Sequence, residues 1–483
     1  MSQATHYQTA PEDRIPFSQK LAYGAGALVN NLLASTGNLI VPVLNMGLGM
    51  NPALAGLAAS LPRLTDAITD PLMGYISDNT KSRWGRRRPY IFAGAIMAGL
   101  LLMLLWQLPD NKSESFYFWY FLIVSVFFFL AYTVYATPWV ALGYELTPDY
   151  HERTRLMGVQ NFIGQPVWMI AGYYVYFTQN WFDNMKDGAA ALAIIMGVVV
   201  IAIGILPAIF LRERFREIAV AEAATQVKQG IWHAVAGFLR GFATTVKFAP
   251  FLKLCLATFL IFNGFQLIGA FQIYVLTYYV FDGSIELGSK YTGHALLIGA
   301  LSTLLIIPFI TWLGTKIGKR RALVVAIAVS IIGYGSKWFL YNPAAPWMAL
   351  LPAPLQAFGL GALFTITPSM IADVVDLDEL NTHERREGMY GSIFWWVVKL
   401  GLALALAMSG LLLNWTGFDI ALEGAQTEQA IVLMRACDAF IPVISSLVAI
   451  WAIVSYPITE QRAHEVRQEL ESRRGTTDQP VTS

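Results

Sequence analysis

The chain has 483 residues, of which 56% are hydrophobic and only 13% are charged, with a formal net charge of +1. A soluble domain carries about 25% charged residues, so this composition excludes an ordinary soluble protein. The two cysteines, Cys255 and Cys437, both fall in apolar runs, which excludes a disulfide framework and a paired-cysteine metal site.

Twelve apolar stretches are each long enough to cross a bilayer, which takes about 20 residues. The sequence therefore predicts an all-α membrane protein with twelve transmembrane helices. Their approximate bounds are 20–46, 53–77, 89–108, 117–146, 156–178, 189–212, 250–281, 292–315, 321–341, 347–375, 387–414 and 430–456.

These spans divide the chain into five parts. Residues 1–19 form a polar cytoplasmic tail, and the apolar run after it is too long for a signal peptide, so no cleavage is expected. Residues 20–212 and 250–456 hold six spans each. The cytoplasmic linker 213–249 contains an amphipathic pattern that predicts a helix on the membrane surface. The polar cytoplasmic tail 457–483 is expected to be disordered.

Lysine and arginine gather in alternate loops. Lys81–Arg88 and Lys316–Arg321 fall on one side of the predicted membrane, whereas Asp110, Asp183 and Asp282 fall on the other. The positive-inside rule places both termini in the cytoplasm. The absence of long soluble segments favours a multi-pass protein of a bacterial inner membrane.

The two halves contain related loops. His151-Glu152-Arg153 matches His383-Glu384-Arg385, and Gly85–Arg88 matches Gly318–Arg321, at nearly the same offset of about 232 residues. Two matches in equivalent loops indicate duplication of a six-helix unit, giving two pseudo-symmetric halves. Parallel six-helix repeats build the major facilitator fold, in which the substrate binds near the midplane between the halves.

Some charged residues inside the predicted spans are the main candidates for function. Asp66 and Asp70 interrupt the second span and Lys399 the eleventh, although such a residue at a helix centre costs about 2.5–3.5 kcal/mol. Asp66 and Asp70 are four residues apart and share one helix face, so both can bind one cation or proton. The alternative is a structural ion cluster with Arg63. Lys399 either neutralises the aspartates, receives an anionic substrate group or forms a structural ion pair.

Four segments carry a resemblance to a known family. They are LPRLTDAITDPLMGYISDNTKSRWGRRRPY at 61–90, KLAYGAGALVNN at 20–31, YTVYATPW at 132–139 and REGMYGSIFWWVVK at 386–399. They resemble the glycoside–pentoside–hexuronide:cation symporters of the major facilitator superfamily. The resemblance covers nearly the whole chain, and it implies cation-coupled transport. Related architectures carry sucrose or lysolipids, so the substrate does not follow from the fold.

The resemblance assigns roles to particular positions. It implies that Asp66 and Asp70 ligate the coupling cation and that Thr133 assists them. Arg63 matches an arginine of the charge network before the first aspartate. Lys399 matches a lysine that lies beside the cation and sugar sites.

Three positions depart from melibiose permease, the best-known member of that family. Two family aspartates are replaced by Asn31 and Ala136, and a sugar-binding arginine is replaced by Asn161. These losses argue against melibiose as the substrate. They also weaken the argument for sodium, which prefers oxygen ligands, so sodium and proton coupling both stay open. No cofactor is expected besides this ion.

Embedded amides and aromatic rings are the candidates for lining a sugar site. Buried amides need partners, which a wet sugar cavity or a neighbouring helix can supply. Aromatic residues in spans stack on sugars or simply pack. The substrate-facing candidates are Asn31, Asn161, Gln266, Trp139 and Trp395, together with Lys399.

Charged residues at the cytoplasmic helix ends are interpreted as gates or struts. The loop after the second span resembles the conformational latch of the superfamily, and a topology signal alone is the alternative. The gating candidates are Asp78, Arg83, Arg86, Glu145, Arg153, Asp376 and Arg385.

The sequence thus predicts a secondary transporter that moves a sugar or glycoside with sodium or a proton. An acidic sugar, such as a uronide or a sulfonated hexose, is the attractive substrate class. The alternatives are a sodium-dependent carrier of lysolipids or other amphiphiles, and a non-transporting sensor. No nucleotide-binding or metalloprotease motif supports an enzyme. Membrane lipid and a small sugar are the expected partners, without nucleic acid, and the protein is expected to be a monomer.

Overall fold

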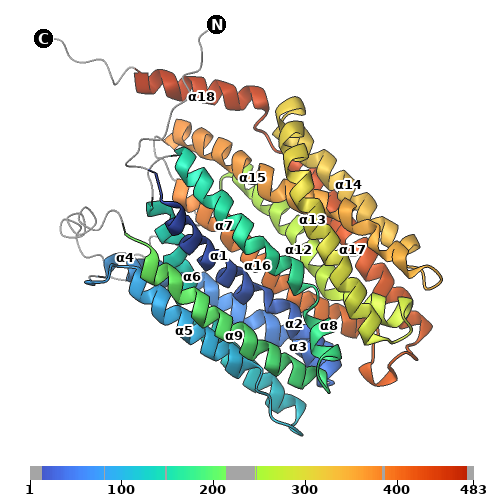
Figure 1. Cartoon of the computed structure of the whole chain (residues 1–483). Coiled ribbons are helices and arrows are strands. Elements are labelled where there is room, and N and C mark those ends of the chain that lie inside the picture. Colours follow the sequence, from blue (N-terminus) through green and yellow to red (C-terminus); the bar gives the residue numbers. More distant parts are fainter. Residues whose placement is uncertain are drawn as a thin grey trace, which may run out of the picture. The chain divides into compact units, whose positions relative to one another are not determined.

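The computed structural model describes residues 14–80, 82–146, 150–213, 245, 247–382 and 387–475, and every regular element in these ranges is helical (Figure 1). The predicted linker helix lies outside them. The chain forms two compact units, one made of Met1–Met50 and Leu61–Val235, the other of Asn51–Ser60 and Ala236–Ser483. The start of the second predicted span, residues 53–60, therefore groups with the second unit.

The first unit, unit 1, contains most of the N-terminal spans. Its elements are α1 (Phe17–Ser35), α2 (Gly37–Pro42), the π-helical η2 (Val43–Gly47), the 3₁₀-helical η3 (Leu61–Thr65), α4 (Asp66–Asn79), α5 (Arg88–Leu105), α6 (Glu114–Glu145), α7 (Tyr150–Ala171), α8 (Tyr174–Asn180) and α9 (Met185–Phe210). Helix α5 packs against α6 and α9, and α1 packs against α7 and α9. Small residues allow the close crossings: a Cβ on Gly94 would lie 2.6 Å from the backbone nitrogen of Tyr135.

The second unit, unit 2, contains the C-terminal spans and one short N-terminal helix. Its elements are α3 (Pro52–Ser60), α12 (Ala249–Val275), the π-helical η4 (Leu276–Val280), α13 (Ile285–Ile317), α14 (Lys319–Leu340), η5 (Pro346–Leu350), α15 (Pro352–Thr382), α16 (Glu387–Trp415), η6 (Ile420–Leu422), α17 (Glu428–Val454) and α18 (Glu460–Gly475). Helix α12 packs against α16 and α17, α14 packs against α15 and α17, and α3 packs against α16.

Within the described residues, ten helical stretches are long and apolar enough to cross a membrane. Two further spans complete the predicted twelve. One is the second span, which the structure divides into α3, η3 and α4; the other is α7, whose first turns are polar. The order of elements agrees with a twelve-helix membrane fold.

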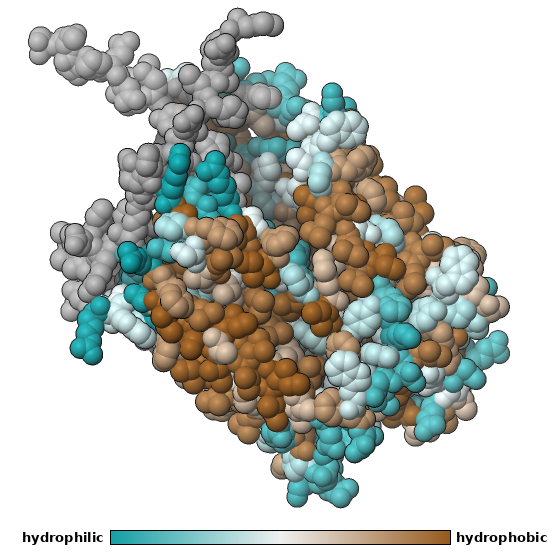
Figure 2. Space-filling model, in the orientation of Figure 1, coloured by the Kyte–Doolittle hydropathy of each residue, from teal (hydrophilic) through white to brown (hydrophobic). Residues whose placement is uncertain are grey.

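The surface of unit 1 carries an apolar region suited to lipid. Figure 2 shows hydrophobic side chains gathered over α5 and α9. Exposed large apolar residues on these helices include Met97, Leu100, Leu104, Ile194, Ile195, Val198, Ile209 and Phe210. Contiguous apolar surface of this kind marks contact with a membrane.

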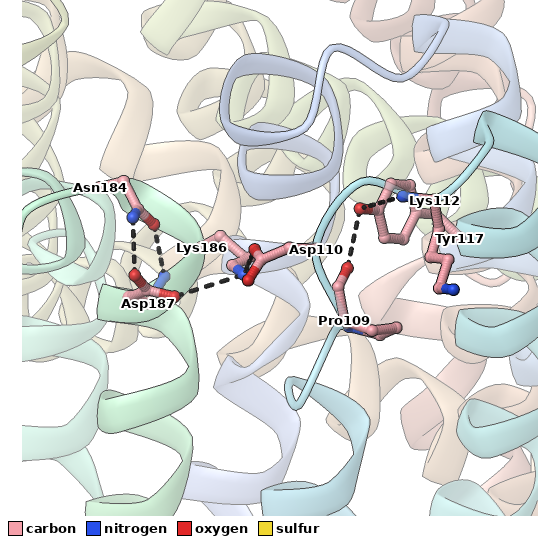
Figure 3. Close-up of polar contacts among 7 residues, drawn as sticks. All are labelled: Pro109, Asp110, Lys112, Tyr117, Asn184, Lys186 and Asp187. Carbon is pink, nitrogen blue, oxygen red and sulfur yellow. Dashed lines mark hydrogen bonds and ion pairs between the residues drawn. The ribbon is translucent and has the colours of Figure 1, made fainter.

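Polar contacts tie together the two loops at the end of unit 1 opposite the basic loop (Figure 3). Lys186, at the start of α9, forms an ion pair with Asp110, which follows α5, and lies 3.5 Å from Asp187. The side chain of Asn184 caps α9 by accepting from the backbone nitrogen of Asp187 at 2.8 Å. Asp110 was predicted on the non-cytoplasmic side, and Lys186 joins it to Asp187 at the start of α9.

The C-terminal tail differs from the prediction of disorder. Residues Glu460–Gly475 form α18, and the side chains of Val466 and Leu470 are buried against Leu380 of α15. This segment is strongly polar, so its composition hides the two apolar residues, one helical turn apart, that dock it. The prediction of disorder was therefore wrong for these residues.

Candidate functional site

The second membrane span is broken directly before its carboxylates. Helix α3 ends at Ser60, the 3₁₀ segment η3 covers Leu61–Thr65, and α4 begins at Asp66. Pro62 has no backbone N–H, so it removes one helical hydrogen bond and favours an interruption here. A stretch of 3₁₀-helix inside a longer helix often marks a functional hinge.

Asp66, Asp70 and Thr133 form the predicted cation site in unit 1. Asp66 is 4% exposed and lies on the first turn of α4. One turn later, Asp70 accepts a hydrogen bond from the hydroxyl of Thr133 on α6 at 2.9 Å, and Thr69 lies 3.5 Å from the same hydroxyl. The structure thus places two carboxylates on one helix and a hydroxyl from a second helix beside the latter carboxylate. Oxygen ligands of this type suit a hard cation, and paired carboxylates suit a proton.

Arg63 lies in η3, beside these carboxylates. Its side chain is 8% exposed, its guanidinium carbon lies 4.2 Å from the ring centre of Phe129, and it interacts electrostatically with Asp66 and Tyr132. Within the described residues, its Nε and Nη2 atoms have no hydrogen-bond partner. Arg63 therefore supplies positive charge to the cluster, and two of its nitrogen atoms can still donate hydrogen bonds.

The amides of α1 bind neighbouring helices. The hydroxyl of Tyr132 donates to Oδ1 of Asn30 at 3.0 Å, and Nδ2 of Asn31 donates to the carbonyl of Gly164 at 2.9 Å. Hydrogen bonds between helices, such as these two, are the alternative to sugar binding that was expected for embedded amides.

Trp139 occupies a packed position. It is 1% exposed, stacks on Tyr23 with 4.9 Å between ring centres, and donates from Nε1 to the carbonyl of Tyr23 at 3.3 Å. A Cβ on Gly26 would lie only 2.1 Å from its indole nitrogen. The ring of Trp139 is therefore enclosed between α1 and α6, and its place at a sugar site stays a prediction.

The other substrate candidates differ in exposure. Asn161, on α7 of unit 1, is exposed. In unit 2, Gln266 and Lys399 are partly buried, and Trp395 is 54% exposed with its ring stacked 6.0 Å from that of Phe364. An exposed aromatic ring of this kind remains available to lipid or ligand.

The gating candidate Arg86 belongs to a loop held by one carboxylate. Glu213, after α9, accepts from the backbone nitrogens of Arg86 and Arg87 at 2.9 and 3.0 Å. Gly85 has φ = 110°, and a Cβ there would lie 2.5 Å from the Glu213 carboxylate. Arg88 donates to the last carbonyls of α9, Ala208 and Ile209.

The corresponding loop of unit 2 shows the same design. Gly318 has φ = 85°, and a Cβ there would lie 2.9 Å from the carboxylate of Glu460. Arg320 donates to the carbonyl of Tyr456, just after α17, at 3.1 Å. In both units a glycine with positive φ faces a carboxylate that follows the sixth span, which supports the duplication inferred from sequence.

The remaining gating candidates are only partly described. Arg83 is exposed, and Asp376 is partly buried on α15. The side chains of Asp78, Glu145 and Arg153, and the whole of Arg385, lie outside the described residues.

Glu152, the neighbour of Arg153, ties α7 to the start of α1. Its side chain is 2% exposed and pairs with Lys20 at 2.6 Å and Arg155 at 3.1 Å. It also accepts from the backbone nitrogen of Ile15 at 2.9 Å. Burial raises the pKa of Glu152, but the hydrogen bonds from Lys20, Ile15 and Arg155 outweigh burial and hold its pKa below the ordinary value of 4.5.

The sequence reasoning missed a buried ion pair in unit 2. Nζ of Lys337 on α14 lies 2.7 Å from both carboxylate oxygens of Asp438 on α17, and both side chains are 1% exposed. Each residue is a charge inside a predicted span. The criterion that selected Asp66 and Lys399 would have found both.

The fold and the charged cluster define a multi-pass membrane transporter of the major facilitator type. A family profile described as MFS/sugar transport protein matches residues 22–460. The chain belongs to this family, which confirms the resemblance seen in the sequence, and the family consists of transporters rather than enzymes.

Curated relatives span nearly the full chain at low identity. A symporter of Synechocystis, sll1374, is described as uncharacterized; it is 26% identical over 96% of this chain and 98% of its own length. The glucuronide carrier protein homolog of Escherichia coli is 21% identical, over 96% of this chain and 97% of its own length. The sodium-dependent lysophosphatidylcholine symporter 1 of Xenopus tropicalis is 23% identical, over 87% of this chain and 83% of its own length.

A solved D-xylose-proton symporter has the same fold. It superposes with a TM-score of 0.62 and 16% identity, over 92% of this chain and 98% of that one.

Proposed function

We propose that the protein is a symporter that moves a sugar or glycoside together with one sodium ion or proton. The observation that carries this proposal is the pairing of Asp70 with Thr133 one turn after the buried Asp66, directly after a break in a membrane helix. Relatives named as symporters and as a glucuronide carrier homolog support it.

The cluster in unit 1 holds two carboxylates, Asp66 and Asp70, and one guanidinium, Arg63. Bound sodium or a proton would add a positive charge beside the two carboxylates, which favours one coupling ion.

Coupling means that the bound ion and the bound substrate each improve the site for the other. Lys399 of unit 2 is proposed to receive an anionic group of the substrate, so an acidic sugar, such as a uronide, fits best. Asn161 and Gln266 are proposed as polar contacts for sugar hydroxyls.

A carrier of lysolipids is the second candidate, because one relative is a sodium-dependent lysophosphatidylcholine symporter. Such a substrate also carries an anionic phosphate that a lysine can bind. It differs from a sugar by an acyl chain, so substrate competition separates the two proposals.

The test is the thermal stability of the purified protein with glucuronides, neutral glycosides and lysolipids, each with and without sodium and at several pH values. A ligand at about 100 times its dissociation constant adds about 2.7 kcal/mol to the stability. We expect a glucuronide-induced shift that grows with sodium or with protons. Asp70→Asn should remove the ion dependence, whereas the control Asp187→Asn, at a half-exposed carboxylate in the first turn of α9, should keep it.

Transport into vesicles completes the test. Accumulation of a labelled glucuronide driven by an ion gradient supports a symporter. Binding without transport would favour a sensor. A response to lysolipids alone would replace the sugar proposal. The proposed setting is a bacterial inner membrane, with both termini cytoplasmic and a monomeric protein.

A further inference from the structure

Arg435, on α17 of unit 2, is held in place by two aromatic side chains. Its guanidinium carbon lies 4.0 Å from the ring centre of Tyr279, in η4, and 4.5 Å from the nearest ring centre of Trp338, in the last turn of α14. Nη2 of Arg435 also donates to the carbonyl of Trp338 at 2.7 Å. Cation–π contacts at these distances position a guanidinium without using its N–H donors. We call these three side chains the arginine cage.

The positive charge of the arginine cage is not neutralised by the carboxylate that follows it on the same helix. Asp438 comes three residues after Arg435, but both of its carboxylate oxygens contact Nζ of Lys337 at 2.7 Å. Among the described residues, no carboxylate forms an ion pair with Arg435, and its buried Nε atom has no hydrogen-bond partner. A guanidinium has five N–H donors, so the arginine cage can still bind an anion.

The arginine cage lies at the end of unit 2 that is opposite the basic loop Lys316–Arg321. Helices α14 and α17 pack side by side (Figure 1). Helix α14 runs from that loop to its last turn, which contains Trp338, and α17 starts at Glu428, about 10 Å along the helix before Arg435. Aromatic side chains near the ends of membrane helices are typical of the level at which lipid head groups meet acyl chains.

Exposed apolar side chains flank the arginine cage. The ring of Phe440 lies 5.4 Å from that of Trp338 and its side chain is 41% exposed, and Val432, one turn before Arg435 on α17, is 42% exposed. This surface therefore combines a cation with hydrocarbon contacts. A phospholipid has the two matching parts, an anionic phosphate and acyl chains, whereas a free phosphate ion would leave the apolar part without a partner.

We propose that the arginine cage binds the phosphate group of an anionic phospholipid, such as phosphatidylglycerol, with the acyl chains lying against Val432 and Phe440. Arginine binds phosphate through paired N–H donors, and basic pockets between membrane helices bind lipid head groups. The bound lipid joins the ends of α14, α17 and η4. Every residue of this site belongs to unit 2. The proposal therefore does not depend on the coupling ion or on the transported substrate.

Site-specific photo-crosslinking tests this lipid site. Val432→p-benzoylphenylalanine places the reactive group beside the arginine cage, in full-length protein in bilayer nanodiscs of equal phosphatidylglycerol and phosphatidylcholine with the same acyl chains. Mass spectrometry then identifies the cross-linked lipid. We expect phosphatidylglycerol to be enriched about tenfold over phosphatidylcholine, as one hydrogen bond to a charged group allows. Val448→p-benzoylphenylalanine is the matched control, because Val448 is 41% exposed on the same helix, about 24 Å away, and should show no enrichment.

Three second-site variants separate the cage from its charge. Arg435→Gln should abolish the enrichment at position 432. Arg435→Lys keeps the charge but lacks the paired donors, so it should retain only part of the enrichment. Tyr279→Leu should lower the enrichment by loosening the guanidinium, whereas Tyr279→Phe keeps the ring and should preserve it.

The same measurements can overturn the proposal. Enrichment at position 432 that equals the control, or that survives Arg435→Gln in folded protein, would refute a lipid site at the arginine cage. Loss of the phosphatidylglycerol cross-link on addition of inorganic phosphate would show that the site takes a free anion instead of a lipid.

Discussion

The Lys337–Asp438 pair allows a quantitative test of how unit 2 is stabilised. Both side chains are 1% exposed, and the ammonium group contacts both carboxylate oxygens at 2.7 Å. Nζ of Lys337 also lies 5.2 Å from the ring centre of Tyr341. Replacement of one partner leaves a charge in the interior with nothing to compensate it. We therefore expect Lys337→Met or Asp438→Leu alone to destabilise the protein by about 3–5 kcal/mol.

The double replacement gives the opposite expectation. Lys337→Met with Asp438→Leu removes both charges and replaces them by apolar groups of similar length. Similar changes of buried pairs are neutral or stabilising by about 1–4 kcal/mol. The coupling between the two sites should therefore be large, and the double variant should be more stable than either single variant.

The measurement is chemical unfolding in mixed detergent micelles, followed by tryptophan fluorescence. The control is the Arg462–Glu465 pair on α18, in which Nη1 of Arg462 lies 3.1 Å from Oε2 of Glu465. The two side chains are 43% and 45% exposed. Exposed pairs contribute about 0.2–1 kcal/mol, so Arg462→Met should change little. A cost below about 1 kcal/mol for Lys337→Met, or a double variant less stable than both single variants, would refute the reasoning.

Three further predictions concern single side-chain contacts. Thr133→Val should weaken ion affinity about tenfold, because loss of a hydrogen bond to a charged group costs about 1.5 kcal/mol, whereas Thr133→Ser should restore it in ion titrations of the melting temperature. Glu152→Gln should lower the free energy of unfolding by about 2 kcal/mol at pH 7. Because the pKa of Glu152 is lowered in the folded protein, this contribution is present above pH 4.5 and is lost as the pH falls through the folded-state pKa. Equal stability differences between variant and wild type at pH 7 and pH 3 would contradict this. Val466→Asp should expose α18 to protease while Val448→Asp, on a lipid-facing site, should not.

The fold was largely predictable because a bilayer imposes strong constraints on sequence. Each span must be apolar over about 20 residues, and each cytoplasmic loop must be basic. Duplicated loops then gave the two-part architecture, and the positive φ of Gly85 and Gly318 gives the repeat a physical basis. The break at Leu61–Thr65 was not predicted, because hydropathy is insensitive to a change from α to 3₁₀ geometry.

Charged residues inside membrane spans were easier to select as candidates from the sequence than residues whose position depends on side-chain packing. Asp70 and Thr133 are neighbours in space, as the family resemblance implied. The sequence places Trp139 in a span but does not say which side of the helix it occupies, because α6 is apolar on every side. In the structure its ring stacks on Tyr23. Lys337 and Asp438 are each recognisable as a charge inside a predicted span, but their pairing across α14 and α17 leaves no local pattern in the sequence.

The two units use buried charge in different ways, and the difference follows from counting. In unit 2, one lysine meets one aspartate with every carboxylate oxygen contacted, so the pair is complete and fixes α14 on α17. In unit 1, two aspartates and one arginine share a cluster, to which the proposed coupling ion would add one positive charge. The cluster lies beside a 3₁₀ break, so the free energy of binding that ion would act next to an irregular backbone, whereas the closed pair lies between two continuous helices.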